Sequence, residues 1–159
     1  MNLNLGKNIK MIISDFDGVF TDGGLYVDSN GNLSKKVNFS DVMGIFLLLK
    51  SGRELAIISG DKAPVIDYLQ KRFGIKEVYQ DIRNKKEVVT DIMKRYNLKE
   101  DEIVYLGDDV NDIDSMQMFN YVVVPQNANF KVKELKHLQI LEKNGGDGFF
   151  REVVDNIIY

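Results

Sequence analysis

Short apolar runs rich in β-branched residues alternate along the chain with longer stretches at helical spacing. The runs are residues 11–13, 55–58, 103–106 and 121–124. Continuous apolar runs of this kind are typical of parallel strands buried on both faces. Apolar side chains three and four positions apart predict helices packed on a sheet. These helical stretches are residues 42–49, 65–73, 88–96 and 113–119. The alternation indicates an α/β fold around a central parallel sheet.

One segment interrupts this alternation between the first and second runs. Residues 25–28 and 33–39 flank a polar turn that contains Asn30-Gly31, a strong hairpin signal. If the second arm is extended throughout, its apolar side chains share one face with Lys35. We therefore expect a β-hairpin whose apolar face needs a partner.

Composition narrows the classes of protein and of site. The 159 residues fit one domain, 1–159, and the net charge of −3 gives no reason to expect nucleic acid. The chain has no cysteine and one histidine, His137, so any bound metal must be held by oxygen. No stretch approaches the roughly 20 apolar residues of a membrane span, so we expect no membrane partner and a cytoplasmic location.

Two carboxylates follow the first apolar run directly. Asp15 and Asp17 stand two residues apart before Gly18. One carboxylate in such a pair can attack phosphorus, while the other protonates the leaving oxygen and then activates water. Taken alone, such a pair is more often a turn with an aspartate cap.

Two further features suit an anion near the same sheet edge. Ser59-Gly60 ends the second run and enters a helix, where backbone N–H groups can hold a phosphate oxygen. Ser59 is explained equally well as a helix N-cap. Lys85 and Lys86 open the helix over 88–96, and a cation there opposes the helix dipole unless an anion lies nearby. Surface lysines are common, so this feature alone decides nothing.

The segment after the third run is strongly acidic. Asp108, Asp109 and Asp112 lie within five positions at a predicted helix start. Three carboxylates exceed what capping needs, and a hard divalent cation best relieves their repulsion. Octahedral oxygen coordination with retained waters points to Mg²⁺.

These four features, in this order, resemble the haloacid dehalogenase (HAD) phosphatase superfamily. The resemblance implies a three-layer Rossmann-like fold with a β-hairpin flap. It implies Asp15 as nucleophile and Asp17 as general acid/base, with Ser59, Gly60, Lys85 and Asn111 around the phosphate or substrate. Mg²⁺ would be held by Asp15, Asp17 through its carbonyl and Asp108, with Asp112 nearby as an orienting carboxylate.

The chain leaves no room for a cap domain. Between Asp15 and Ser59 we expect only the hairpin and one helix, and between Ser59 and Lys85 one helix and a short strand. A site without a cap is open to water, so a neighbouring subunit is the natural source of the missing wall. The apolar face of the hairpin, residues 24–39, gives such a subunit a reason to associate.

The resemblance narrows to the tetrameric phosphatases of 3-deoxy-D-manno-octulosonate (KDO) 8-phosphate on three segments, 22–26, 38–41 and 145–152. It implies a homotetramer formed through the hairpin, residues 24–39, and a role in lipopolysaccharide biosynthesis. In that family the glycine-rich tail can reach an adjoining site. Arg151 is thus a candidate contact to substrate or a neighbouring subunit, and an ion pair within the last helix is an equal alternative.

One departure favours a second substrate. Asp61 follows Ser59-Gly60 where the KDO 8-phosphate enzymes usually carry arginine, and Arg72 lies further along the same helix. An acid there resembles phosphatases of nine-carbon keto-deoxy sugar acid (nonulosonate) 9-phosphates, and Asp61 with Arg72 would then set selectivity.

A receiver domain of a signalling relay is a remote alternative, because its motifs follow another order. A catalytically silent subunit would be favoured only if Asp15 or Asp17 were missing.

Overall fold

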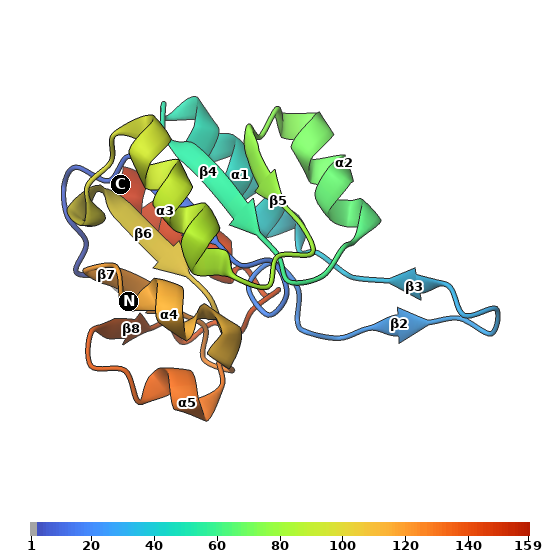
Figure 1. Cartoon of the computed structure of the whole chain (residues 1–159). Helices are drawn as coiled ribbons and strands as arrows, with labels where there is room; N and C mark the ends of the chain where they lie inside the picture. The colour runs from blue at the N-terminus through green and yellow to red at the C-terminus, as the bar shows by residue number, and fades with distance from the viewer. Residues whose placement is uncertain (1–2) are drawn as a thin grey trace.

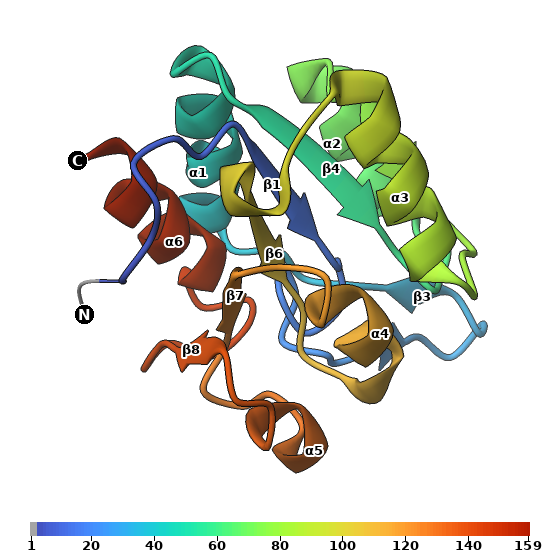
Figure 2. The ribbon, with the colours of Figure 1, turned by 60° about the vertical axis from the view of Figure 1, so that its left-hand side comes forward.

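A computed structural model describes residues 3–159 as a central sheet between two layers of helices (Figures 1 and 2). Six parallel strands lie in the order β5-β4-β1-β6-β7-β8. They are β1 Met11–Ser14, β4 Glu54–Ile58, β5 Glu77–Tyr79, β6 Ile103–Leu106, β7 Tyr121–Val124 and β8 Leu138–Ile140. The order places β1 between β4 and β6, so the loops after these three strands meet at one edge of the sheet, where parallel α/β sheets bind ligands.

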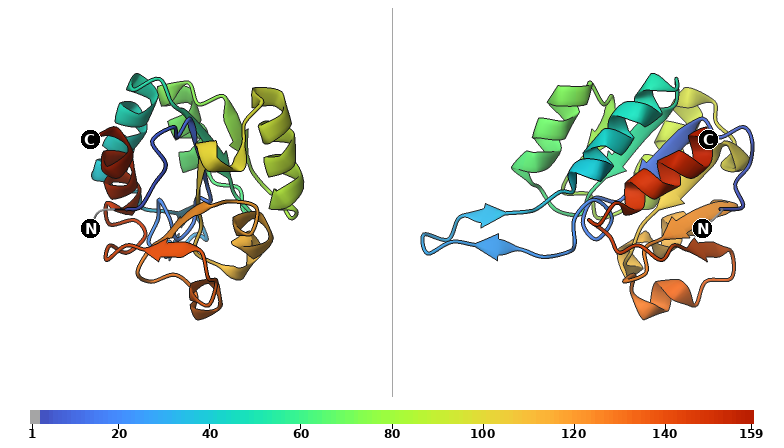
Figure 3. Two further views of the ribbon diagram at one scale, coloured as in Figure 1. Left: turned by 90° about the vertical axis from the view of Figure 1, so that its left-hand side faces the viewer. Right: turned by 180° about the vertical axis from the view of Figure 1, so that it is seen from behind.

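Alternate side chains of β1 pack on opposite faces of the sheet. Ile12 belongs to a core with the helices α1 Phe39–Lys50, α2 Pro64–Phe73 and α6 Phe149–Ile158. Met11 and Ile13 belong to a core with α3 Lys85–Tyr96, α4 Ile113–Met116 and α5 Phe130–Lys133. Figure 3 shows α1 and α6 on one side of the sheet and α3 on the other. Two 3-10 turns, η1 Glu100–Glu102 and η2 Val110–Asp112, flank β6. The predicted α/β fold is confirmed.

The hairpin consists of β2 Tyr26–Val27 and β3 Leu33–Ser34, which pair antiparallel and project from the body of the molecule (Figure 1). The second arm, expected over 33–39, pairs only over Leu33–Ser34. Phe39 begins α1, because Asn38 caps that helix by accepting the Ser40 N–H at 2.8 Å. Side-chain capping at Asn38 thus decides the end of the extended segment.

Two smaller differences concern short elements. The helix expected over 113–119 ends at Met116, although Phe119 beyond it is still buried. Strand β8 lies in a charged stretch where no strand was expected, because three residues are too few to show a period. Within residues 3–159, none of the helices is both long and apolar enough to cross a membrane.

The C-terminal segment packs against the loop that follows β1. The Gly146 N–H donates to the Val19 carbonyl at 2.9 Å. A Cβ on Gly145 would lie 1.7 Å from the Gly18 carbonyl oxygen, so only glycine permits this approach. Asp41, buried in α1, accepts the N–H groups of Gly148 and Arg151 at the start of α6. Burial raises the pKa of Asp41 to about 6, although both hydrogen bonds act to lower it.

Candidate active site

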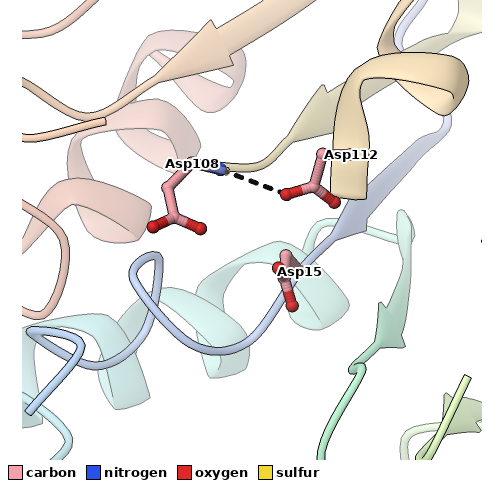
Figure 4. A group of neighbouring side chains, drawn as sticks. All are labelled: Asp15, Asp108 and Asp112. Carbon is pink, nitrogen blue, oxygen red and sulfur yellow. Dashed lines mark hydrogen bonds between the residues drawn. The ribbon is translucent and has the colours of Figure 1, made fainter. Parts of the chain in front are cut away.

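The strand register brings the predicted motifs together. Ser14 of β1 pairs with Leu106 of β6 and with Ile57 of β4, so Asp15 leaves the sheet beside the loops that carry Asp108 and Ser59. The Asp15 N–H donates to the Leu106 carbonyl at 2.9 Å and fixes the backbone there. Asp15, Asp108 and Asp112 each place one carboxylate oxygen within 4.8 Å of the others. Figure 4 shows these side chains around a common space, Asp15 from the loop after β1 and the other two from the segment after β6.

Gly18 allows the first loop to lie directly on Asp108. Its φ of +73° is in the left-handed region, which other residues adopt at a cost. A Cβ at this position would lie 1.9 Å from the Asp108 Oδ2 atom. The glycine therefore sets how closely the loop after β1 approaches the carboxylates of the β6 loop.

Lys85 is the counter-ion of this cluster. Its ammonium lies 2.7 Å from Asp15 Oδ2 and 2.8 Å from Asp112 Oδ1, and only 1% of its side chain is exposed. Burial lowers the pKa of Lys85, but the charges of Asp112 and Asp15 outweigh it, so the net shift is upward. Its neighbour Lys86 is exposed. The helix position thus singles out Lys85 as the cation at the site.

Asp112 connects the members of the cluster through hydrogen bonds. It is fully buried and accepts hydrogen bonds from Lys85 and from the Tyr105 hydroxyl at 2.9 Å. Its other oxygen accepts the Asp108 N–H at 3.2 Å, the contact drawn in Figure 4. A carboxylate so occupied is well suited to orient its neighbours.

Asp15 and Asp108 have raised pKa values for related reasons. Burial is the largest cause in both, followed by the charge of Asp112. The pKa of Asp15 lies well above its ordinary value despite Lys85, and that of Asp108 rises to about 7. Within residues 3–159 the Asp108 carboxylate accepts no hydrogen bond.

Three carboxylates with one ammonium leave an excess of negative charge in a partly buried place. Such a group of hard oxygen donors fits a divalent cation of the Mg²⁺ type. A bound cation would stabilise the ionised forms of Asp15 and Asp108, which burial disfavours. The donor chemistry therefore fits the expected metal held by Asp15 and Asp108. Asp112 lies next to them and accepts the Asp108 N–H.

Asp17 lies beside the cluster and is held by a residue that the sequence did not identify. It is about one-third exposed and accepts a hydrogen bond from the Thr21 hydroxyl at 3.2 Å. Lys35 donates to Asp17 and to Asp61, at 2.7 Å each. Burial lowers the pKa of Lys35, but these two partners more than compensate, and the bond to Lys35 lowers the pKa of Asp61. In the sequence, Lys35 gave only the signal of a cation on an apolar face.

Ser59, Gly60 and Asn111 lie on the loops that face each other across this edge. Ser59 is buried, and its hydroxyl accepts the Asp61 N–H at 3.2 Å. A Cβ on Gly60 would lie 3.6 Å from the Asn111 Nδ2 atom. The loops after β4 and β6 thus bring these predicted residues close together.

Two predicted arginines are not brought to the cluster within this chain. Arg72 is exposed in the last turn of α2 and donates to the Tyr68 hydroxyl. Asp61 precedes the first turn of α2, a helix that is about 15 Å long at 1.5 Å per residue. Arg151 pairs with Asp155 one turn along α6, with 2.8 Å between Nε and Oδ1. The ion-pair alternative for Arg151 is thus the one observed.

Comparison with known proteins agrees with this geometry. Residues 54–153 match the haloacid dehalogenase-like hydrolase family. A 3-deoxy-D-manno-octulosonate 8-phosphate phosphatase of Haemophilus influenzae is 32% identical over 96% of this chain and 84% of its own. The crystal structure of such a phosphatase from Yersinia pestis superposes with a TM-score of 0.90 at 30% identity, covering 96% of this chain and 82% of that one. Another, from Moraxella catarrhalis in complex with magnesium, phosphate and KDO, has a TM-score of 0.88 at 28% identity, covering 96% and 87%.

Proposed function

Because the chain belongs to the haloacid dehalogenase-like hydrolase family and is a phosphatase, we propose that it hydrolyses KDO 8-phosphate with the help of Mg²⁺. The observation that carries the reaction type is a buried ion pair: Asp15, at the end of β1, contacts Lys85, which also contacts Asp112. The choice of sugar acid is supported by the names of the similar enzymes and by the KDO held in the Moraxella structure. The proposed unit is one domain, residues 1–159, without a nucleic-acid or membrane partner.

The reaction proceeds in two steps on the chain's own groups. Asp15 attacks phosphorus to form an aspartyl-phosphate, the bond to the sugar oxygen breaks, and Asp17 gives that oxygen a proton. Asp17 then takes a proton from water, which attacks phosphorus and frees both inorganic phosphate and the Asp15 carboxylate. Lys85, Ser59 and the two loops that carry Gly60 and Asn111 surround the phosphoryl oxygens.

A cation of the Mg²⁺ type fits Asp15, the Asp17 carbonyl and Asp108, near Asp112. When bound, it neutralises charge on the phosphoryl oxygens. Asp112 contributes by holding Lys85, Tyr105 and the Asp108 backbone in place. These assignments divide the acids into one nucleophile, one acid/base and supporting ligands.

The deciding experiment measures phosphate release from KDO 8-phosphate and from a nine-carbon keto-deoxy sugar acid 9-phosphate at equal concentration, with Mg²⁺ and with EDTA. We expect release from KDO 8-phosphate, dependent on Mg²⁺ and absent in Asp15→Asn. The nine-carbon substrate is the second candidate, because the acid Asp61 follows Ser59-Gly60. A strong preference for it would replace the first proposal, and release from neither would overturn both sugar assignments.

The hairpin offers a surface for assembly. Leu25, Tyr26, Val27 and Leu33 are between 51% and 61% exposed, and Phe39 at the start of α1 is 67% exposed. Apolar groups gathered in this way indicate an interface. We propose a homotetramer through residues 24–39. Sedimentation should give a tetramer for the wild type and smaller species for Leu33→Asp, and a monomeric wild type would refute the proposal. A cytoplasmic location and a role in lipopolysaccharide biosynthesis complete the proposal.

A further inference from the structure

Lys35 connects two carboxylates that come from distant parts of the chain. Its ammonium lies 2.7 Å from Asp17 Oδ2 and 2.7 Å from Asp61 Oδ2, and 10% of its side chain is exposed. Asp17 belongs to the loop after β1, Asp61 to the loop after β4, and Lys35 to the segment between the hairpin and α1. One cation thus joins three loops at the mouth of the site.

The geometry leaves Lys35 as the main restraint on the Asp17 side chain. The other hydrogen bond to that carboxylate among the described residues comes from the Thr21 hydroxyl, at 3.2 Å. Asp61 is anchored in turn, because its N–H donates to the buried Ser59 hydroxyl. The ion pairs therefore transmit the position of the β4 loop, through Lys35, to Asp17.

We propose that Lys35 is a positioning residue for the phosphatase reaction, holding the Asp17 side chain where its protonated carboxyl group delivers a proton to the leaving oxygen. Asp61 acts in the same unit, since it fixes the other side of the Lys35 ammonium. This inference rests on the proposed role of Asp17 as general acid. It gives Asp61 a function inside the chemistry that does not depend on which sugar acid binds.

Leaving-group chemistry provides a test specific to this role. A good leaving group such as p-nitrophenolate needs little protonation, whereas phenolate, a poorer one of similar size, depends more on a general acid. The measurement is kcat/KM for p-nitrophenyl phosphate and for phenyl phosphate, because it reports on the step that expels the leaving group. Both substrates lack a sugar, so the test stands even if the KDO assignment fails.

The test variant is Lys35→Met, and the matched control is Lys36→Met. Lys36 is adjacent, exposed and without an ion pair among residues 3–159. We expect Lys35→Met to lower kcat/KM at least tenfold more for phenyl phosphate than for p-nitrophenyl phosphate. Lys36→Met should change both by less than twofold. An equal loss on both substrates in Lys35→Met would overturn the proposal, since a merely structural defect lowers both alike.

Two further variants test the unit. Lys35→Arg keeps the charge and should recover part of the phenyl phosphate activity. Asp61→Asn should have little additional effect in the Lys35→Met background, because its influence passes through Lys35. Fully additive effects would contradict this coupling. Unchanged sedimentation and melting temperature establish that each variant keeps the wild-type assembly and fold.

Discussion

Replacing Lys85 with methionine removes the only cation in contact with the buried carboxylates of Asp15 and Asp112 among the described residues. Methionine fills most of the volume of the lysine stem, so the change is mainly one of charge. The three side chains are between 0% and 6% exposed. Water therefore does little to screen the two acids once the ammonium is gone.

The expected loss of stability is large. Removing one partner from a buried ion pair costs about 3–5 kcal/mol, because the remaining charge stays uncompensated. Mg²⁺ should recover much of this loss. Two unit charges about 4 Å apart interact by about 4 kcal/mol at an effective dielectric constant of 20, so removing an ammonium from the cluster favours a cation there. We expect Mg²⁺ to bind Lys85→Met at least tenfold more tightly, which corresponds to about 1.4 kcal/mol of additional stabilisation.

The assay is urea unfolding followed by circular dichroism at pH 8, with EDTA and across a Mg²⁺ titration. Lys86→Met is the matched control, because Lys86 is the exposed neighbour in the same helix turn. Its free energy of unfolding should change by less than about 0.5 kcal/mol. A cost below about 1 kcal/mol for Lys85→Met in EDTA would refute the reading of Lys85 as the essential counter-ion. A Mg²⁺ effect no larger than in the wild type would refute the charge argument.

Four other outcomes test the remaining parts of the structure. Asp15→Asn should abolish phosphate release while circular dichroism and melting stay those of a folded protein; substantial activity would exclude Asp15 as nucleophile. Asp108→Asn should chiefly raise the Mg²⁺ concentration needed for activity, and an unchanged titration would count against it as a ligand. Gly18→Ala should lower the free energy of unfolding by about 1–2 kcal/mol, because the φ of this residue is +73°. It should also weaken the Mg²⁺-induced thermal shift, because the added Cβ would lie 1.9 Å from Asp108 Oδ2, and a normal shift would contradict that contact. Hydrogen bonding to Arg95, Tyr79 and Tyr96 lowers the pKa of Glu77 from 4.5 to about 2. The stabilisation by ionised Glu77 is thus present above pH 4.5 and lost as the pH falls toward 2. The free energy of unfolding of the wild type should exceed that of Glu77→Gln by about 1–3 kcal/mol at pH 7, and this difference should shrink in acid. A difference that stays constant with pH would disprove the role of Glu77.

The sequence located much of the site because parallel strands end at a common edge. Asp15, Ser59 and the acidic segment at Asp108 each follow an apolar run, and the register of β1 with its two neighbours brings them together. Lys85 and Lys86 could not be separated by pattern alone, because both stand at a helix start. Burial separates them, since Lys85 is 2% exposed and its neighbour is on the surface.

The parts that escaped prediction depend on long-range packing. Lys35 reaches Asp17 across 18 positions of the chain, from the segment that precedes the Asn38 cap of α1. Asp41 is buried because it accepts N–H groups from the start of α6, 107 and 110 residues away. Local periodicity carries no information about either contact. Helical spacing placed Asp61 and Arg72 on one helix. In the structure Asp61 lies in the loop before α2 and Arg72 in the last turn of α2, so the length of the helix separates them.

The packing of the glycine-rich tail on the first loop governs when the site is complete during synthesis. Gly145 and Gly146 contact Gly18 and Val19, which precede them by about 130 residues. At about 5–20 residues per second, a ribosome needs roughly 6–26 s to make that stretch. Strand β1 also cannot pair in the sheet until its two neighbours, β4 and β6, have been made, because both follow it in the chain. A nascent chain therefore carries the carboxylates of Asp15 and Asp17, without a finished site, for most of its time on the ribosome.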